Sequence, residues 1–156
     1  GSDTAQGIVL NKPGSGTLAQ LLDGAPKSSP SGTVLGPDWP GSTWDELALN
    51  SLRPFLDRVV FQGGPIVHEA IDDSVLWLHR HGRIVPDAWE IAPAVYLGGM
   101  LGTAAALESA RAARGDAGGL RFFRGFAAWA LSQLEIELER GVWIRARAAC
   151  PSATFE

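Results

Sequence analysis

The chain has 156 residues, which suits one domain that buries roughly two-thirds of the surface of its unfolded form. Hydrophobic residues make up 46% and charged residues 19%, a composition that excludes a disordered chain. The net charge of -4 argues against a protein that binds nucleic acid through its phosphates, because such proteins carry a basic face.

The sequence also sets limits on metals, membranes and targeting. Cys150 is the single cysteine, so it forms no disulfide within the chain and lacks the partners of a zinc site. We find no apolar run near the ~20 residues of a membrane helix. Gly1 and Ser2 are typical of a scar left by cleavage, and we expect no targeting segment after them. The sequence therefore predicts no bound metal, no cofactor and no membrane span.

Strands and helices alternate along the chain without the regular spacing of βαβ units. The segments predicted as strands are 7–11, 58–62, 74–80, 94–98, 120–126 and 142–146. The segments predicted as helices are 17–24, 44–52, 99–115 and 130–140. Residues 25–41 are rich in Pro, Gly and Ser and are predicted as a loop insertion. This order favours an α+β fold, a mixed sheet with helices packed on it.

Local chemistry sets several of these boundaries. Pro13 cannot donate a ladder hydrogen bond, so the first strand is predicted to end at Lys12. Thr17 is a suitable N-cap for the helix that follows. The segment 74–80 alternates, so Val75, Trp77 and His79 share one face of a strand that is at least half buried on both sides.

A glycine-rich stretch resembles a phosphate-binding turn. The residues from Gly14 to Ala19 match the loose G-x-G-x-x-A pattern, in which glycines let backbone amides approach a pyrophosphate at a helix N-terminus. That motif needs a second strand ending in an acidic residue about 20 residues further on. Here that region is the Pro-rich loop, so a plain corner between strand and helix is favoured over a dinucleotide site.

The histidines give incomplete metal or catalytic patterns. His68 and Glu69 begin half of an H-E-x-x-H zinc motif, but Asp72 stands where the second histidine would be. His79 and His81 are two residues apart and would share a strand face, without a third ligand in view. We find no G-x-S-x-G pattern, and Cys150 has no activating context.

The segment 120–143 is the most distinctive part of the sequence. Gly125 would allow close backbone packing after a strand, Trp129 would fill the junction with the next helix, and Trp143 would close its far side. Gln133 and Glu135 project at the start of that helix. We favour a structural role for Gln133, a hydrogen bond to the loop backbone, over a role in binding a ligand.

Four sequence blocks, in order, resemble the AlgH-like family, which is also called YqgE-like. The blocks are Gly7-Ile-Val-Leu-Asn-Lys-Pro13, Phe61-Gln-Gly-Gly-Pro65, Val75-Leu-Trp-Leu-His79, and Phe126-Ala-Ala-Trp129 with Gln133, Glu135, Glu137 and Trp143. They resemble that family's N-[KR]-P strand end, its G-G-P turn, its Leu-His strand, and its G-Y-x-x-W-x-x-x-Q-L-E-x-E…W signature. The Arg121-Phe-Phe block and the Ala-Ala-Cys150 end look closest to plastid-type members from green plants and algae.

The resemblance implies an α+β fold in one domain over residues 7–148, with a bent mixed sheet flanked by helices. It supplies no agreed catalytic residue, cofactor or substrate. Members usually carry about two further strands before the first block and a helix after the last strand, and the signature tyrosine is Phe126 here. The sites matched by motif are Asn11, Pro13, Gly63, Gly64, Pro65, His79, Gly125, Trp129, Gln133 and Glu135.

Two classes of function follow from these observations. The first is a non-catalytic binding or regulatory protein, such as a subunit or assembly factor of a larger plastid complex, which uses Trp39, Trp44 or an open sheet edge to contact protein partners. The second is an enzyme of hydrolase type, or a small-ligand-binding protein, with a cleft near Asn11, the turn 63–65, His79 and Gln133.

Nucleic-acid binding ranks third among the functions we consider. It would rest on Arg121, Arg124, Arg145 and Arg147, four of the arginines in the last third of the chain. The resemblance implies a chloroplast location, with the bacterial cytoplasm as the alternative. A partner protein is therefore the expected ligand, and no nucleic acid is expected.

Overall fold

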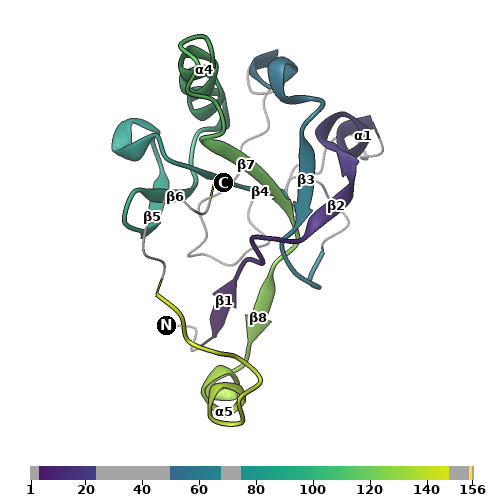
Figure 1. Ribbon diagram of the computed structural model, residues 1–156, viewed down its shortest axis with the longest axis vertical. Helices are drawn as coiled ribbons and strands as arrows, with labels where there is room; N and C mark the ends of the chain where they lie inside the picture. The colour runs from purple at the N-terminus through teal and green to yellow at the C-terminus, as the bar shows by residue number, and fades with distance from the viewer. Residues whose placement is uncertain (1–3, 24–49, 68–74, 148–154, 156) are drawn as a thin grey trace.

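The computed structural model describes residues 4–23, 50–67, 75–147 and 155, which form two sheets and three α-helices (Figure 1). The strands are β1 (Ala5–Gly7), β2 (Pro13–Thr17), β3 (Val59–Gln62), β4 (Val75–His79), β5 (Ala88–Ala92), β6 (Val95–Gly98), β7 (Leu120–Arg124) and β8 (Ala127–Trp129). The helices are α1 (Leu18–Asp23), α4 (Leu101–Ala112) and α5 (Gln133–Glu139), with 3-10 turns η1 (Arg53–Phe55) and η2 (Gly82–Ile84).

The larger sheet is mixed. Its six strands lie in the order β2-β3-β7-β4-β6-β5, and β1 and β8 form a separate antiparallel pair. β3 runs parallel to β7, while the other neighbours pair antiparallel. The expected α+β fold, a mixed sheet with helices in a single domain, is confirmed.

Strand β4 is the centre of the sheet and is buried along its whole length. It pairs with β7 over all five of its residues and with β6 at its end. The predicted alternation is confirmed, because Val75 and Trp77 belong to one hydrophobic cluster and Leu76 and Leu78 to another. A central strand needs apolar side chains on both faces, which explains its nearly continuous apolar sequence.

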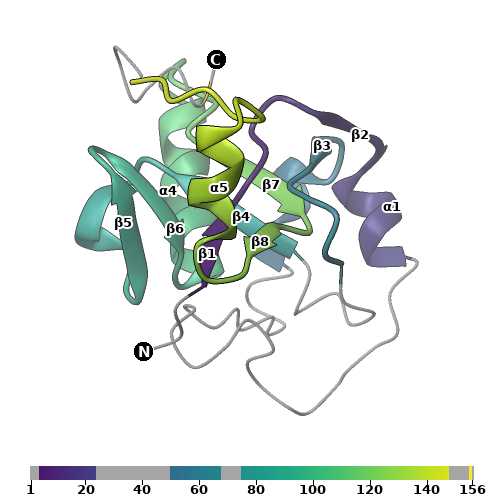
Figure 2. The same cartoon turned by 90° about the horizontal axis from the view of Figure 1, so that it is seen from below.

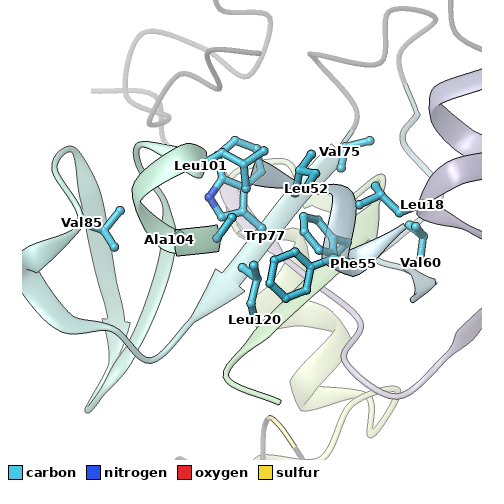
Figure 3. Packing of buried hydrophobic residues seen from close by; sticks show 12 residues of the cluster. Leu18, Leu52, Phe55, Val60, Val75, Trp77, Val85, Leu101, Ala104 and Leu120 are labelled. Carbon is cyan, nitrogen blue, oxygen red and sulfur yellow. The ribbon is translucent and has the colours of Figure 1, made fainter. Parts of the chain in front are cut away.

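Helices cover the face that carries Trp77. The cluster on this face is Leu18, Leu52, Phe55, Val60, Val75, Trp77, Val85, Leu101, Ala104, Ala105, Leu120 and Phe122. Trp77 lies in it with Leu101 and Ala104 of α4 (Figure 3). The Trp77 indole Nε1 donates to the Gly98 carbonyl at 2.9 Å, so the one polar atom of this buried ring is satisfied.

The opposite face has a second cluster. Its buried members are Leu76, Leu78, Val95, Leu97, Phe123, Phe126 and Phe155. Ile8, Phe61 and Ile66 pack against it and remain partly exposed. The sheet is thus buried on both faces, and residues from both ends of the described chain contribute to the second cluster.

The strands β1 and β8 and helix α5 extend away from the six-stranded sheet, and residues 140–147 turn back from α5 toward it (Figure 1). We call residues 5–7 and 127–147 the projecting unit, and Figure 2 looks onto its helix α5. None of the residues of α5 is buried. The helix is therefore held by polar contacts and by the two-stranded sheet rather than by a core of its own.

Several predicted elements agree with the structure. The strands predicted at 58–62, 74–80, 94–98 and 120–126 correspond to β3, β4, β6 and β7 with shorter bounds. The helices predicted at 17–24, 99–115 and 130–140 correspond to α1, α4 and α5. The loop 25–41, residues 1–2 and most of the helix 44–52 lie outside the described residues, although Asn50 and Ser51 are helical.

Other predictions were wrong at the ends of the chain. The predicted strand 7–11 is a short strand that ends at Gly7 and an irregular segment, and Pro13 begins β2 instead of ending a strand. A proline is tolerated there because β2 is at the edge of the sheet. Residues 142–146 are exposed and form no strand, so within the described residues this segment pairs with no sheet.

Truncation of a buried leucine tests the position of the core. Leu120 is fully buried, so Leu120→Ala should lower the free energy of unfolding by about 2–5 kcal/mol through lost contacts and a cavity. Leu131 is 69% exposed, so the same substitution there should change it by no more than about 0.5 kcal/mol. Urea denaturation of both variants is the measurement, and equal losses would contradict the assigned core.

Candidate functional site

Three of the motif blocks meet where the six-stranded sheet passes into the projecting unit. The Val9 amide donates to the Gly63 carbonyl at 2.7 Å, and the Gln62 amide donates to the Lys12 carbonyl at 2.8 Å. The Gly63 amide donates to the Arg124 carbonyl at 2.8 Å. We call residues 8–12, 63–66 and 124–126 the junction. These connections are made by backbone groups.

Two glycines allow the backbones to approach at the junction. A Cβ atom on Gly64 would lie 2.1 Å from the carbonyl carbon of Phe126, closer than any real contact of this type. Gly125 has φ +74, a left-handed conformation that side chains disfavour, and a Cβ there would lie 2.7 Å from the carbonyls of Gly64 and Ile66. The turns at residues 63–65 and 124–126 are therefore two halves of one packing contact, closed by the pairing of Ile66 with Phe126.

The glycine-rich stretch near the N-terminus is not a phosphate-binding turn. Gly14 and Gly16 lie within β2, and α1 follows directly after it. Asn11 is exposed in the bend that precedes β2. Thr17 and Gln20 form a reciprocal cap: the Thr17 amide donates to Gln20 Oε1 at 2.9 Å, and the Gln20 amide donates to Thr17 Oγ1 at 3.4 Å. The first turn of α1 is thus occupied by its own side chains.

Four residues of the signature form one hydrogen-bonded group around a carboxylate. Glu137 Oε2 accepts from Trp129 Nε1 at 3.0 Å and from Trp143 Nε1 at 2.6 Å, and Glu137 Oε1 accepts from Gln133 Nε2 at 2.9 Å. The two indole rings meet edge to face with centroids 5.9 Å apart. Gln133 Oε1 also accepts from the Ala130 amide at 3.1 Å. We call Trp129, Gln133, Glu137 and Trp143 the Glu137 cluster.

The Glu137 cluster explains the spacing of the signature. Gln133 and Glu137 are one helical turn apart on α5, so their side chains are neighbours. Hydrogen bonds from Trp143 and Gln133 hold the pKa of Glu137 below its usual value. Glu135, which the motif match includes among the candidate site residues, is exposed in the first turn of α5. The four-residue spacing from Gln133 was the signal that could have identified Glu137 instead.

The projecting unit also exposes large apolar side chains. The exposed fractions are 69% for Leu131, 44% for Ile136, 60% for Val142, 46% for Trp143 and 91% for Ile144. The chain around the last three carries Arg140, Arg145 and Arg147, all exposed. We call the five apolar residues the apolar surface. The indole of Trp143 belongs to it, while its Nε1 atom is tied to Glu137.

His79 lies away from the junction, so the expected cleft is not formed. His79, on β4, pairs with Leu120 at the start of β7. Gly63 and Gly125 follow the last residues of the parallel strands β3 and β7, at the opposite end of the sheet. The His79 side chain is fully buried. The His81 amide donates to His79 Nδ1 at 3.2 Å, which leaves Nε2 to donate to the Gly98 carbonyl at 3.2 Å. Both ring nitrogens are therefore engaged.

Burial and the charge of His81 lower the pKa of His79 to about 4. The ring is neutral at pH 7, and it stacks between His81 and Tyr96 at centroid distances of 5.6 and 5.7 Å. A ring with neither a free nitrogen nor a carboxylate partner is poorly suited to general acid-base work. This geometry favours a structural role for His79.

A buried carboxylate that the sequence analysis missed lies beside these histidines. Glu108 of α4 is fully buried, and its Oε1 accepts from the amides of Gly118 at 2.6 Å and Gly119 at 2.9 Å. Its Oε2 lies 3.3 Å from His81 Nε2, a close approach without hydrogen-bond geometry. Burial alone would raise the pKa of Glu108, but His81 and the two amides hold it below its usual value.

The position of Glu108 along α4 could have indicated from the sequence that its side chain is buried. Leu101, Ala104 and Ala105 are the other buried residues of α4, so Glu108 lies one turn further along the same buried face. Within the described ranges we find no group of three or more His, Cys, Asp or Glu side chains that could hold a metal. His68, Glu69, Asp72 and Cys150 lie outside the part of the chain that the structure describes.

Comparison with known proteins agrees with this fold. The solution structure of the AlgH protein from Pseudomonas aeruginosa superimposes with a TM-score of 0.56 at 22% identity, covering 99% of this chain and 66% of that one. The chain therefore has the fold of AlgH. The AlgH-like family model matches residues 1–156, and the chain belongs to the AlgH-like family.

The similar curated sequences are bacterial. A UPF0301 protein of Chlorobaculum parvum is 33% identical over 94 residues, covering 60% of this chain and 47% of that protein. A UPF0301 protein of Pelodictyon phaeoclathratiforme is 33% identical over 101 residues with the same coverage. The chain thus spans about half the length of the curated relatives it matches. These bacterial relatives are consistent with the bacterial cytoplasm, the alternative location, and do not support a chloroplast location.

The charge state of His79 predicts how stability depends on pH. Its pKa is about 4 in the folded protein and about 6.5 in the unfolded chain, so the unfolded chain binds more protons between these values. The free energy of unfolding should fall as pH drops from about 6.5 to 4, by up to roughly 3 kcal/mol. Denaturation at several pH values measures it, and His79→Gln should flatten this dependence.

The Glu137 cluster predicts a second acid transition, local to the projecting unit. Because the pKa of Glu137 is lowered in the folded protein, its stabilising effect is present above the unfolded pKa and is lost as pH falls through the folded one. The indole N–H signals of Trp129 and Trp143 in NMR spectra should then shift together. Glu137→Gln should abolish this transition and Glu135→Gln should keep it. Identical spectra for the two variants would contradict the cluster.

Proposed function

We propose that the protein is a non-catalytic binding or regulatory protein that docks a partner protein through the projecting unit, as part of a larger assembly. The observation that carries this proposal is the apolar surface. Its five large apolar side chains are exposed within the short stretch 131–144, and exposed apolar side chains gathered on a surface are characteristic of interaction sites. The unit stands apart from the six-stranded sheet, so a partner can reach it without disturbing the main core (Figure 1).

The Glu137 cluster supports the proposed docking function because it holds the exposed indole of Trp143 in one orientation. Trp143 is 46% exposed, yet its Nε1 atom is bound to Glu137 and its ring contacts the edge of Trp129. A side chain already held in one orientation loses little entropy on binding. Tryptophan residues of this kind are enriched among the residues that dominate binding energy at protein interfaces.

The chemistry of the partner follows from the residues around this anchor. Residues 140–147 carry Arg140, Arg145 and Arg147 and no acidic residue, among exposed Val142, Trp143 and Ile144. Arginine is favoured at interfaces because its guanidinium binds carboxylates in a bidentate way. The partner segment we propose is therefore acidic and contains apolar side chains.

A sheet edge offers a second contact on the same unit. Within the described residues the small sheet consists of β1 and β8 alone, so each strand has one unpaired edge. An extended partner segment can add a strand to such an edge. This contact would place the partner beside α5, next to the apolar surface, and would use the open sheet edge that the sequence analysis predicts.

The alternative functions have less support. An enzyme would need a base, and both nitrogens of His79 are already engaged, at a position remote from the junction. Nucleic-acid binding would need a continuous basic face, but Arg121 lies over the Phe61 ring on the six-stranded sheet, while Arg145 follows α5 in the projecting unit. The arginines are thus divided between two parts of the molecule.

Substitution of the most exposed apolar residue tests this function. Tagged protein purified from native lysate should retain an acidic partner, identified by quantitative mass spectrometry, whose binding is then measured with both purified proteins. Ile144→Asp should weaken that binding by about tenfold or more, because it places a charge in the contact. The matched control is Ile84→Asp, since Ile84 is 70% exposed but lies in η2, outside the projecting unit.

Three outcomes would contradict the proposal. They are equal binding by the Ile144 and Ile84 variants, retention of no partner but further copies of this chain, and binding that does not weaken with added salt. An acidic partner beside exposed arginines should bind less tightly as salt screens the charges. Light scattering of the purified chain identifies the case in which the apolar surface is covered by a second copy.

A further inference from the structure

A cavity of about 420 Å³ lies beside the second half of α4. Helix α4 is at the opposite end of the molecule from α5 (Figure 1). Its lining residues are Arg80, His81, Ile84, Leu107, Arg111, Arg114 and Asp116. The cavity is assembled from the end of β4, from η2, from α4 and from the turn after it. It shares no residue with the junction or with the Glu137 cluster, so it is a separate feature of the fold.

Positive charge exceeds negative charge in this lining. Three arginines face one aspartate, which leaves a formal charge of 3 − 1 = +2 without counting His81. Asp116 lies between two of them: Arg80 Nη2 is 3.0 Å from Asp116 Oδ1, and Arg111 Nη2 contacts Asp116 Oδ2. Glu108 lies behind the lining, where Arg58 and the loop amides already compensate its charge.

The third arginine has no acidic partner in the described part of the chain. Arg114 is exposed, and its Nε donates to the Ala110 carbonyl at 3.1 Å, a bond that fixes the stem of the side chain. The Nε atoms of Arg80 and Arg111 are buried and have no hydrogen-bond partner within the described ranges. Asp116 engages one Nη atom each of Arg80 and Arg111, and the Ala110 carbonyl engages Nε of Arg114, so the other Nη atoms are left to bind a ligand.

The backbone around the cavity is ordered before any ligand arrives. The Asp116 amide donates to the Arg111 carbonyl at 3.0 Å, and the Arg80 amide donates to the Gly119 carbonyl at 3.1 Å. The first bond closes the turn after α4, and the second ties Arg80, which follows β4, to the segment that precedes β7. Such preorganisation reduces the entropy that binding would otherwise cost.

An apolar wall adjoins the charged groups. Ile84 is 70% exposed and Leu107 is partly buried, and both line the same hollow. A volume near 420 Å³ is at the small end of the range for organic ligands. The lining therefore combines a place for an anion with a place for a small apolar group.

We propose that this cavity binds a small organic phosphate, a phosphate monoester with an apolar or aromatic part, through Arg80, Arg111 and Arg114. The formal charge of +2 matches a phosphate monoester, which carries about −1.5 to −2 at neutral pH, better than it matches a single carboxylate. Guanidinium groups bind phosphate oxygens in a bidentate way. Ile84 and Leu107 contact the organic part. The site is independent of the apolar surface and of any partner bound there.

Calorimetric titration of the whole chain tests this site with three probes: phenyl phosphate, inorganic phosphate and benzoate. Phenyl phosphate should bind most tightly. Arg114→Ala should weaken its binding by about tenfold or more, because one charge-assisted contact is lost. Arg114 is exposed, so this variant should fold normally. Arg53→Ala, an exposed arginine outside the cavity, is the matched control and should bind as the unmodified chain does.

A second variant separates the apolar wall from the charges. Ile84→Ser should weaken the binding of phenyl phosphate but leave that of inorganic phosphate unchanged. The proposal is overturned if no phosphate probe binds at millimolar concentration, if Arg114→Ala and Arg53→Ala weaken binding equally, or if benzoate binds as tightly as phenyl phosphate. Equal losses in the two arginine variants would mean that the anions are attracted by general surface charge.

Discussion

The close approach of two backbones at the junction is the contact on which the arrangement of the molecule depends. Gly64 and Gly125 let the turn after β3 and the turn after β7 pack against one another without side chains between them. Because β3 and β7 are parallel neighbours, both turns leave the same end of the sheet. The chain can then continue directly from β7 into β8, and the pairing of β8 with β1 begins where the large sheet stops.

The projecting unit has a different physical basis from the rest of the fold. The six-stranded sheet is held by two hydrophobic clusters, whereas α5 has no buried residue and is organised by one carboxylate that accepts three side-chain hydrogen bonds. Apolar side chains that would fill a core elsewhere are left exposed here. Polar contacts within the unit thus free its apolar side chains for contact with another molecule, and this division of roles underlies the proposed function.

The sequence predicted the interior of the fold better than its ends. The strand β4 and the helix α4 were predictable because burial imposes a regular period on their residues. Strands β1, β2, β5 and β8 are short or lie at an edge, and their pairing depends on partners distant in sequence. Gly14 and Gly16 have the composition of a turn, but they lie within β2, where the register with β3 shifts between the paired residues Pro13 and Thr17. Tertiary pairing overrode local preference at this point.

The sequence predicted individual residues of the candidate site, but not which of them lie close together in the structure. The motif residues Gly63 and Gly125 lie at the junction, and Trp129 and Gln133 lie beyond it in the projecting unit, but no spacing in the sequence indicated that His79 would lie at the other end of the paired strands. Glu137 was visible as a helical neighbour of Gln133, whereas its bond to Trp143 depends on how the chain turns after α5. The arginine-lined cavity could not be predicted, because its members come from four separate elements.

The carbonyl of Gly98 has a consequence for how the sheet aligns. It accepts from Trp77 Nε1 and from His79 Nε2, so two side chains of β4 share one oxygen on β6. A ladder of backbone bonds alone permits a strand to slip by two residues while keeping the same faces buried. Here a slip would leave two buried donors without an acceptor, at a cost of about 1–3 kcal/mol each. These two side-chain hydrogen bonds therefore favour one register between β4 and β6.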